Sequence, residues 1–443
     1  MAAAGSAVGL GNIWKFPYEA GENGGGAFLI VYLVCVVLFG LPLVMTEFVI
    51  GQRSGKGAFG AFRELRGNSR WQWLSWMCMF SVMIMMGFYF VVTGWCVNYL
   101  WEMIIGSFSG MDTQGLMTHF QRITTNTPRM ILCSVIPIAM TAAVLWAGVN
   151  EGIERLSKIL MPLLLVMMLI MVGRVLMLDN SSAGLRFFFK MDFAKITPQV
   201  VMEAVGQCFF SLSVGLGTLI TYGAYMSKNQ KVTSVSLQVV ILDTIVAVLA
   251  GIIIFPAVFS FGFNPAEGPE LVFVVLPAIF EQMSFSWLSG VLFFLLLFIA
   301  ALTSTISLME VAVAFICEAS EKKASKGTGK SISRHLSVLI VAVAVCVLST
   351  LCVMSMTGQA DWMKVAGRDL FDLFNDLGSL VLLPLGGLCM ALFVGWFMPK
   401  HYLSGFPEET GTKRLLRSAY LFVVRWVAPL TILLILLNGF GII

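Results

Sequence analysis

Long apolar stretches constrain the fold of this chain more than any other feature of its sequence. A helix that crosses a bilayer needs about 20 mostly apolar residues. Eleven such runs follow one another along the chain, at 1–20, 24–52, 71–106, 129–149, 157–178, 197–224, 233–261, 285–317, 333–356, 370–398 and 418–442. Only 12% of the residues are charged, about half the share found in soluble domains. The sequence therefore predicts an all-α membrane protein with about 11 transmembrane helices in a lipid bilayer, and nothing in it indicates a nucleic-acid partner.

The positions of Lys and Arg predict the orientation of these helices. Basic residues gather in the loops after the second, fourth, sixth, eighth and tenth runs, as in Arg53, Lys56 and Arg63. Cytoplasmic loops carry an excess of Lys and Arg. We therefore expect the N-terminus to be cytoplasmic and the C-terminus, after eleven crossings, to be external. Runs 1–5 and 6–10 then have opposite topologies.

The tetrapeptide Val-Gly-Leu-Gly occurs near the start of each of these halves, at 8–11 and at 214–217. Each Gly inside a helix costs about 1 kcal/mol relative to Ala. Glycine-interrupted apolar segments at matching positions in two halves indicate the substrate site of a secondary transporter. The sequence thus predicts a 5+5 inverted repeat, with helices 1 and 6 broken at the membrane midplane. The first repeat would span 1–178 and the second 197–398, followed by a cytoplasmic loop and helix 11 at 399–443.

The first half-helix is expected to be short in this sequence. Met1 lies only four residues before Gly5. A half-helix that runs from the midplane to the membrane surface needs about ten residues at 1.5 Å each. We therefore expect the first repeat to lack most of this half-helix.

Asp243 is the most informative single residue. It stands within the apolar run 233–261, where a carboxylate costs on the order of 3 kcal/mol or more. That run contains no basic residue that could pair with it, so a cation ligand is the favoured interpretation. An intramembrane protease would need paired Asp residues, a Ser–His dyad or an HExxH motif, and the three His residues lie far apart, at 119, 335 and 401. The sequence therefore predicts that the protein is not an enzyme.

Three longer motifs resemble the neurotransmitter:sodium symporter family, in its bacterial amino-acid transporter branch. The first is Gly-Ser-Ala-Val-Gly-Leu-Gly-Asn-Ile-Trp-Lys-Phe-Pro-Tyr at 5–18. The second is Gln-Cys-Phe-Phe-Ser-Leu-Ser-Val-Gly-Leu-Gly at 207–217, and the third is Ala-Ala-Leu-Thr-Ser-Thr-Ile-Ser-Leu-Met-Glu at 300–310. The resemblance extends over the whole chain.

The resemblance implies a substrate site and two sodium sites around the breaks. The expected substrate-binding residues are Ser6, Ala7, Gly9, Leu10, Gly11, Met85, Tyr89, Phe210, Ser211, Ser213, Leu216, Ser304 and Leu308. The first sodium site would be formed by the substrate carboxylate with Ala7, Asn12, Ser211 and Asp243. The second would be formed by Gly5, Val8, Ala300, Thr303 and Ser304.

The residues that would gate this site are less regular. Lys15 stands where most members of the family have Arg, and Lys lacks the bidentate geometry with which Arg pairs to a carboxylate. Asp372 and Asp376 are the acidic candidates for its partner on the external side, although an ungapped count places Asn375 at that position. Tyr225 is the candidate on the cytoplasmic side.

The resemblance implies sodium-coupled symport of a zwitterionic, hydrophobic amino acid into the cell by alternating access. The expected location is the bacterial inner membrane, with two Na⁺ as coupling ions, no organic cofactor, and a monomer or weak dimer as the working unit. Animal members place a neutral Asn where Asp243 stands and need chloride, so transport here is expected to be chloride-independent. A substrate-gated channel or a transport-inactive sensor on the same fold is the alternative.

Overall fold

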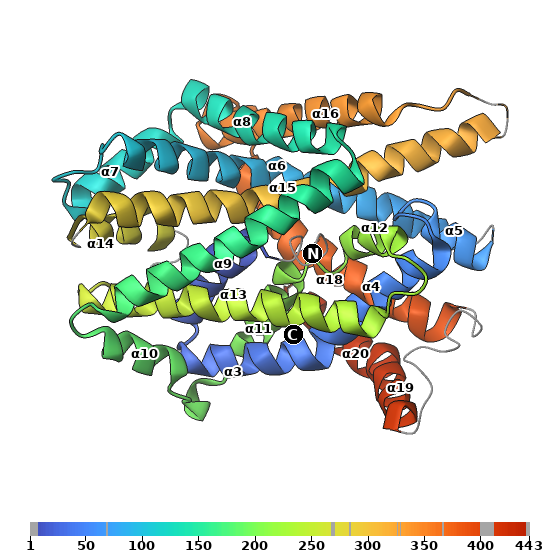
Figure 1. Cartoon of the computed structure of the whole chain (residues 1–443), viewed down its shortest axis with the longest axis horizontal. Coiled ribbons are helices and arrows are strands. Elements are labelled where there is room, and N and C mark those ends of the chain that lie inside the picture. Colours follow the sequence, from blue (N-terminus) through green and yellow to red (C-terminus); the bar gives the residue numbers. More distant parts are fainter. Residues whose placement is uncertain are drawn as a thin grey trace.

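The computed structural model of the chain describes residues 8–67, 70–266, 271–282, 285–325, 327, 329–365, 367–398 and 412–439. Within these ranges the chain is almost entirely helical, and most helices run along the long axis of the molecule (Figure 1). Nine helical stretches in these ranges are long and apolar enough to cross a membrane: Gly26–Ser54, Arg70–Ile104, Thr127–Trp146, Arg155–Leu176, Val232–Ser260, Ser286–Ser325, Arg334–Met356, Leu370–Phe397 and Arg417–Leu437.

Short π-helical or 3₁₀ turns, labelled η, interrupt or join several α-helices. In chain order the elements are η1 (Gly11–Lys15), α2 (Phe16–Glu22), α3 (Gly26–Cys35), η2 (Val36–Gly40), α4 (Leu41–Ser54), α5 (Ala61–Arg66), η3 (Arg70–Gln72), α6 (Trp73–Ile104), α7 (Thr113–Thr124), α8 (Thr127–Trp146), η4 (Val149–Glu154), α9 (Arg155–Leu176), α10 (Ser181–Phe189), η5 (Phe193–Lys195), α11 (Pro198–Ser211), α12 (Thr218–Tyr225), α13 (Val232–Ser260), η6 (Leu271–Val275), α14 (Leu276–Gln282), α15 (Ser286–Ser325), α16 (Arg334–Met356), η7 (Asp361–Met363), α17 (Leu370–Asp376), η8 (Leu377–Leu382), α18 (Leu383–Leu392), η9 (Phe393–Phe397), α19 (Thr412–Phe422), η11 (Val423–Val427) and α20 (Ala428–Gly439).

The two remaining predicted runs are the interrupted ones. In the first, η1 and α2 follow the glycine segment directly, and in the sixth, α11 ends at Ser211 and α12 begins only at Thr218. Together with the nine continuous spans, they account for the eleven predicted runs. The predicted all-helical membrane fold, with its first and sixth helices broken, is therefore confirmed, whereas the repeat boundaries at 178, 197 and 398 stay a prediction.

The structure differs from the sequence prediction mainly at helix ends and in loops. Helix α15 continues to Ser325, beyond the predicted end of the run at residue 317. The added segment contains Glu, Lys and Ala, which favour helix in water, so the helix can continue beyond the bilayer. Several predicted loops also contain helices, among them α7, whose N-terminus is capped by Asp112.

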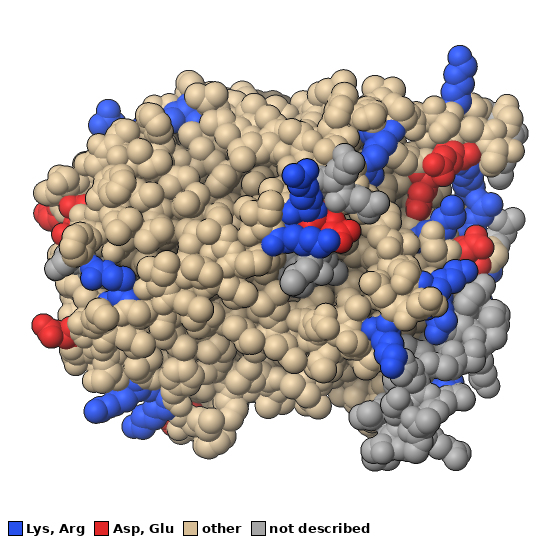
Figure 2. Space-filling view, in the orientation of Figure 1, with Lys and Arg blue, Asp and Glu red and all other residues tan. Residues whose placement is uncertain are grey.

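The spans form two groups that lie side by side in Figure 1. Helices α6, α8, α15 and α16 pack together on one side, and α3, α4, α11 and α13 on the other. The interrupted first segment lies between the groups, because η1 contacts both α13 and α15. Figure 2 shows a largely uncharged face, on which charged side chains gather at the two ends of the molecule and in one cluster nearer its middle. The wide uncharged areas of this face fit contact with a bilayer.

Candidate functional site

A cluster of buried polar side chains joins the two breaks to α13. Asn12 on η1 donates from Nδ2 to Ser211 Oγ at 2.8 Å and to Asp243 Oδ1 at 2.7 Å. Ser211, the last residue of α11, donates to both carboxylate oxygens of Asp243 at 2.8 Å. Tyr32 Oη adds a contact of 3.2 Å to Asp243 Oδ2. The structure thus brings together the side chains predicted for the first sodium site, whereas Ala7 lies outside the described residues.

Two side chains of this region also hold the backbone of the first break. Asn12 Oδ1 accepts a hydrogen bond from Gly9 N at 3.0 Å. Gln207 Nε2 donates to the Gly11 carbonyl at 2.7 Å. An interrupted helix leaves backbone groups that need partners away from water. The partners here are amide side chains. Gln207 belongs to the second sequence motif, but its contact with the first break was not predicted.

A second oxygen cluster connects the first break to α15. Thr303 Oγ1 lies 3.1 Å from the Val8 carbonyl oxygen and 2.9 Å from that of Ala300. Ser304 is close to the break as well, because a Cβ atom placed on Gly9 would lie only 2.0 Å from Ser304 Oγ. Glycine is therefore required at position 9 for this approach. Four residues predicted for the second sodium site are adjacent, and the fifth, Gly5, lies outside the described residues.

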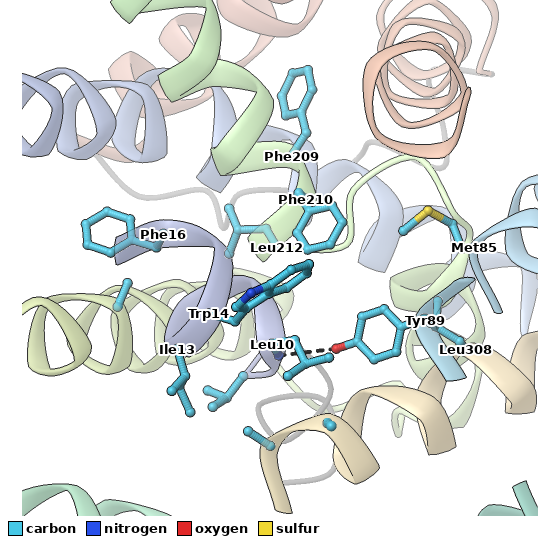
Figure 3. Packing of buried hydrophobic residues seen from close by; sticks show 14 of the residues in the cluster. Leu10, Ile13, Trp14, Phe16, Met85, Tyr89, Phe209, Phe210, Leu212 and Leu308 are labelled. Carbon is cyan, nitrogen blue, oxygen red and sulfur yellow. Dashed lines mark hydrogen bonds between the residues drawn. The ribbon is translucent and has the colours of Figure 1, made fainter. Parts of the chain in front are cut away.

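A small cavity lies beside these clusters. It has a volume of about 20 Å³ and is lined by Gly9, Gly11, Met85, Tyr89, Phe210, Ser211, Ser213, Leu216, Ser304 and Leu308. All ten were predicted to bind substrate, while Ser6 and Ala7 lie outside the described residues. Leu10 is fully buried at the cavity's edge, and its backbone N donates to Tyr89 Oη at 3.2 Å (Figure 3). A cavity of this volume has room for about one water, so the lining must open to admit an amino acid.

The backbone conformation of the second break differs from that of the first. Ser213, Gly215 and Gly217 have φ angles of 53°, 95° and 75°, in the left-handed region that glycine adopts readily and other residues rarely do. Gly215 N donates to Glu47 Oε1 on α4 at 2.6 Å. Glu47 is fully buried and was not predicted to have a role. A carboxylate inside an apolar run is itself a functional signal, so the reasoning applied to Asp243 could have found it.

The structure does not bring the predicted external gate residues together. Lys15 Nζ lies over the ring of Phe210, 4.5 Å from its centroid, and makes no ion pair with Asp372 or Asp376 among the described residues. Asp376 pairs instead with Arg368 at 2.6 Å. The cation therefore covers the aromatic residue above the cavity, an arrangement that stabilises by about 0.5–2 kcal/mol.

At the opposite end of the bundle, Tyr225 belongs to a charged network around a buried carboxylate. Its hydroxyl donates to Glu310 Oε1 at 2.6 Å. Arg334 donates to the same carboxylate through two nitrogens, at 3.0 and 2.6 Å. Glu310 is fully buried, and its pairing with Arg334 ties α15 to the start of α16. The sequence prediction included Tyr225 but missed both charged partners.

Comparisons with known proteins agree with this architecture. The model of the sodium:neurotransmitter symporter family matches residues 1–111 and 107–441. The chain is 35% identical to the uncharacterized sodium-dependent transporter YhdH of Bacillus subtilis, over 100% of the chain and 96% of that protein. A sodium-dependent transporter of Haemophilus influenzae is 33% identical, over 99% of the chain and 96% of the relative. The structure resembles that of MhsT in complex with L-phenylalanine, with a TM-score of 0.89, 37% identity and coverage of 99% and 97%.

Proposed function

The chain belongs to the sodium:neurotransmitter symporter family, and we propose that it carries a zwitterionic amino acid with an apolar side chain into the cell together with Na⁺. Membership of this transporter family implies sodium-coupled transport across a membrane and not enzymatic catalysis. The finer proposal adds the class of substrate, two sodium sites, independence from chloride and the bacterial inner membrane, with a cytoplasmic N-terminus.

The observation that carries this proposal is the uncompensated carboxylate of Asp243. Its side chain is fully buried, and its neighbours Asn12, Ser211 and Tyr32 are all neutral. No Lys, Arg or His among the described residues pairs with it. A buried charge without a partner costs several kcal/mol. A sodium ion is a fitting partner, because the surrounding ligands are hard oxygen donors.

Binding of this ion would also change the first break. The Asn12 amide now directs its nitrogen to Asp243 and its oxygen to Gly9 N. A cation beside Asp243 would need the amide oxygen instead, so the amide would have to turn over. The turn would release the Gly9 N–H from its hydrogen bond. Ion entry and the conformation of the break are thus coupled through one side chain.

The second ion would bind between the first break and α15. Thr303 Oγ1 and the carbonyl oxygens of Val8 and Ala300 converge within hydrogen-bonding distance. The same oxygens can act as ligands if the hydroxyl hydrogen turns away. Each ion that enters down a membrane potential of 100 mV supplies about 2.3 kcal/mol. Two ions supply about 4.6 kcal/mol, which supports a substrate concentration ratio of about 10³.

The cavity lining supports an apolar zwitterion as the substrate. Tyr89 Oη and the Leu10 backbone N face each other and are suited to bind a carboxylate. The rest of the lining is mostly apolar, with Met85, Leu216 and Leu308 among its members. Among the described residues, the lining contains no acidic side chain that would favour a monoamine. MhsT, the similar structure, is in complex with L-phenylalanine.

Binding of the twenty amino acids to the purified protein tests the proposed substrate class. We expect apolar amino acids to bind in Na⁺ and not in K⁺, and to bind equally well with chloride or gluconate as the anion. Isothermal titration calorimetry measures each affinity. Failure of every amino acid to bind would overturn the substrate class, and loss of uptake on removal of chloride would overturn chloride independence alone.

A further inference from the structure

A separate cavity of about 780 Å³ lies between α6, α7 and α8. In Figure 1 these helices meet at the end of the bundle that lies opposite α5. The distribution of Lys and Arg predicts that this end, where the cavity lies, is external. None of the cavity's lining residues belongs to the site around the breaks. Its walls combine polar groups of α7 and of the adjoining helix ends with apolar side chains of α6 and α8. This cavity therefore needs an explanation of its own.

Two buried polar groups in its wall lack partners within the described part of the chain. Asn98 on α6 is 1% exposed, and its Nδ2 atom has no hydrogen-bond partner there. His119 Nε2 on α7 is also buried without a hydrogen bond, 3.8 Å from Glu102 Oε2. A buried group left unsatisfied costs about 1–3 kcal/mol. Both groups line the cavity, so a polar ligand there would satisfy them.

The charges around the cavity favour an anion. Arg129 and Glu102 form an ion pair, so these two charges offset each other. Arg122 is exposed and makes no ion pair among the described residues. Burial lowers the pKa of His119, which favours the neutral imidazole, in which one ring nitrogen donates and the other accepts. The cavity therefore has one uncompensated positive charge and two neutral polar groups.

The outer rim of the cavity is apolar. Trp101, Leu132 and Ile136 line it and are 56%, 62% and 39% exposed. They lie on the membrane-spanning helices α6 and α8, where exposure means contact with lipid, and Trp is typical of the membrane–water interface. A small soluble anion would leave this rim unused. An amphiphile would occupy both parts of the cavity.

We propose that this cavity binds an anionic phospholipid. The phosphate lies against Arg122 and the polar groups of Asn98 and His119, and the acyl chains follow α6 and α8 along Leu132 and Ile136. The lipid belongs to the leaflet at the α7 end. Its binding fastens the loop helix α7 to α6, the helix that also carries Tyr89.

Native mass spectrometry of the purified full chain tests this proposal. The probes are phosphatidylglycerol and phosphatidylcholine with the same acyl chains, with excess inorganic phosphate as a competitor. We expect phosphatidylglycerol to bind more tightly than phosphatidylcholine and not to be displaced by inorganic phosphate. Replacement of Arg122 by Gln removes one basic residue, which near a membrane surface corresponds to about fivefold weaker binding of the anionic lipid.

Arg186→Gln is the matched control. Arg186 is likewise exposed, on α10 at the same end of the bundle, and it does not line the cavity. We expect it to leave phosphatidylglycerol binding unchanged. Equal binding of the two lipids, or equal losses in the two variants, would contradict a specific site. Displacement by inorganic phosphate would show a small-anion site and would overturn the proposed lipid.

Discussion

The two oxygen clusters beside the first break differ in charge and in the elements that they connect. The Asp243 cluster contains a full negative charge and connects η1, the end of α11 and α13 through side chains. The Thr303 cluster is neutral and connects only the first break to α15, largely through backbone carbonyls. The oxygen atoms of the first cluster depend on which side chains are present, and those of the second depend on where the backbone lies.

This difference predicts different roles for the two proposed sodium sites. An ion beside Asp243 would compensate a charge that is fully buried in this structure, so its binding energy would be large. An ion beside Thr303 would be bound only while the Val8 and Ala300 carbonyl oxygens lie close together. Since Val8 belongs to the first break and Ala300 to α15, that site would respond to movement of the break relative to α15. The charged site would contribute most of the sodium affinity, and occupancy of the neutral site would depend on the conformation of the protein.

Asp243→Asn should have the largest effect. The substitution keeps the shape of the side chain and removes the charge that a sodium ion would compensate. Loss of one partner from a buried charged pair costs about 2–5 kcal/mol, so we expect sodium affinity to fall by about a hundredfold. Titration of amino-acid binding with Na⁺ in gluconate buffer measures this. Chloride, as a mobile anion, should restore part of the binding.

Ser236→Ala is a control for this experiment. Ser236 is also fully buried on α13, and its hydroxyl has no hydrogen-bond partner among the described residues. It should leave the sodium titration unchanged. An unchanged titration for Asp243→Asn itself would show that the charge has no part in sodium binding, and the contrast between the two clusters would then be structural only.

Thr303→Val should have a smaller effect. Valine matches threonine in shape but lacks the hydroxyl oxygen, so the second site would lose one ligand and keep its two carbonyls. A hydrogen bond or polar contact to a charged group is worth about 1.5–3 kcal/mol, and we expect sodium affinity to fall by about thirtyfold. The same Na⁺ titration measures this change, and chloride should not restore it.

Thr305→Val is the matched control on the same helix. Thr305 is equally buried, and its hydroxyl contacts Leu302 and Thr141, not the break. If both variants weaken sodium binding to the same degree, the effect of Thr303 is on folding, and the neutral cluster is not an ion site.

Much of the fold could be predicted from the sequence, because membrane-spanning helices are defined locally by their apolar length. The spans of α6, α13 and α16 lie within a few residues of their predicted runs. The helix α7 was not predicted, because a short polar loop helix has no such length requirement. Its position over α6 depends on contacts with residues far away in the sequence, such as the packing of Phe120 on Phe273.

The candidate site was predictable where a motif or an isolated charge identified its residues. Asp243 stood out as a carboxylate in an apolar run, and the lining of the cavity followed from the motifs around the two breaks. The external gate was not predictable in the same way. The sequence offered Asp372 and Asp376 as partners for Lys15, but the structure places the Lys15 ammonium over Phe210. That choice depends on how α17 and η1 are placed relative to each other, which no local pattern specifies.

Tyr89→Phe should have the smallest effect on sodium and should separate the two sites most clearly. The hydroxyl now faces Leu10 N and is proposed to bind the substrate carboxylate, which would itself be a ligand of the sodium ion beside Asp243. Loss of a hydrogen bond to a charged group costs about 1.5 kcal/mol, so we expect amino-acid affinity to fall by about tenfold. Sodium affinity should fall only when the amino acid is present.

Calorimetric titrations of Na⁺, with and without a bound amino acid, measure this dependence. Tyr99→Phe is the control, because Tyr99 is buried on the same helix and stacks on Phe108, away from the break. A loss of sodium affinity without amino acid in Tyr89→Phe would mean that the hydroxyl supports the break itself. The substrate and the ion at Asp243 would then not share a ligand, and the proposed coupling would have to act through Asn12 alone.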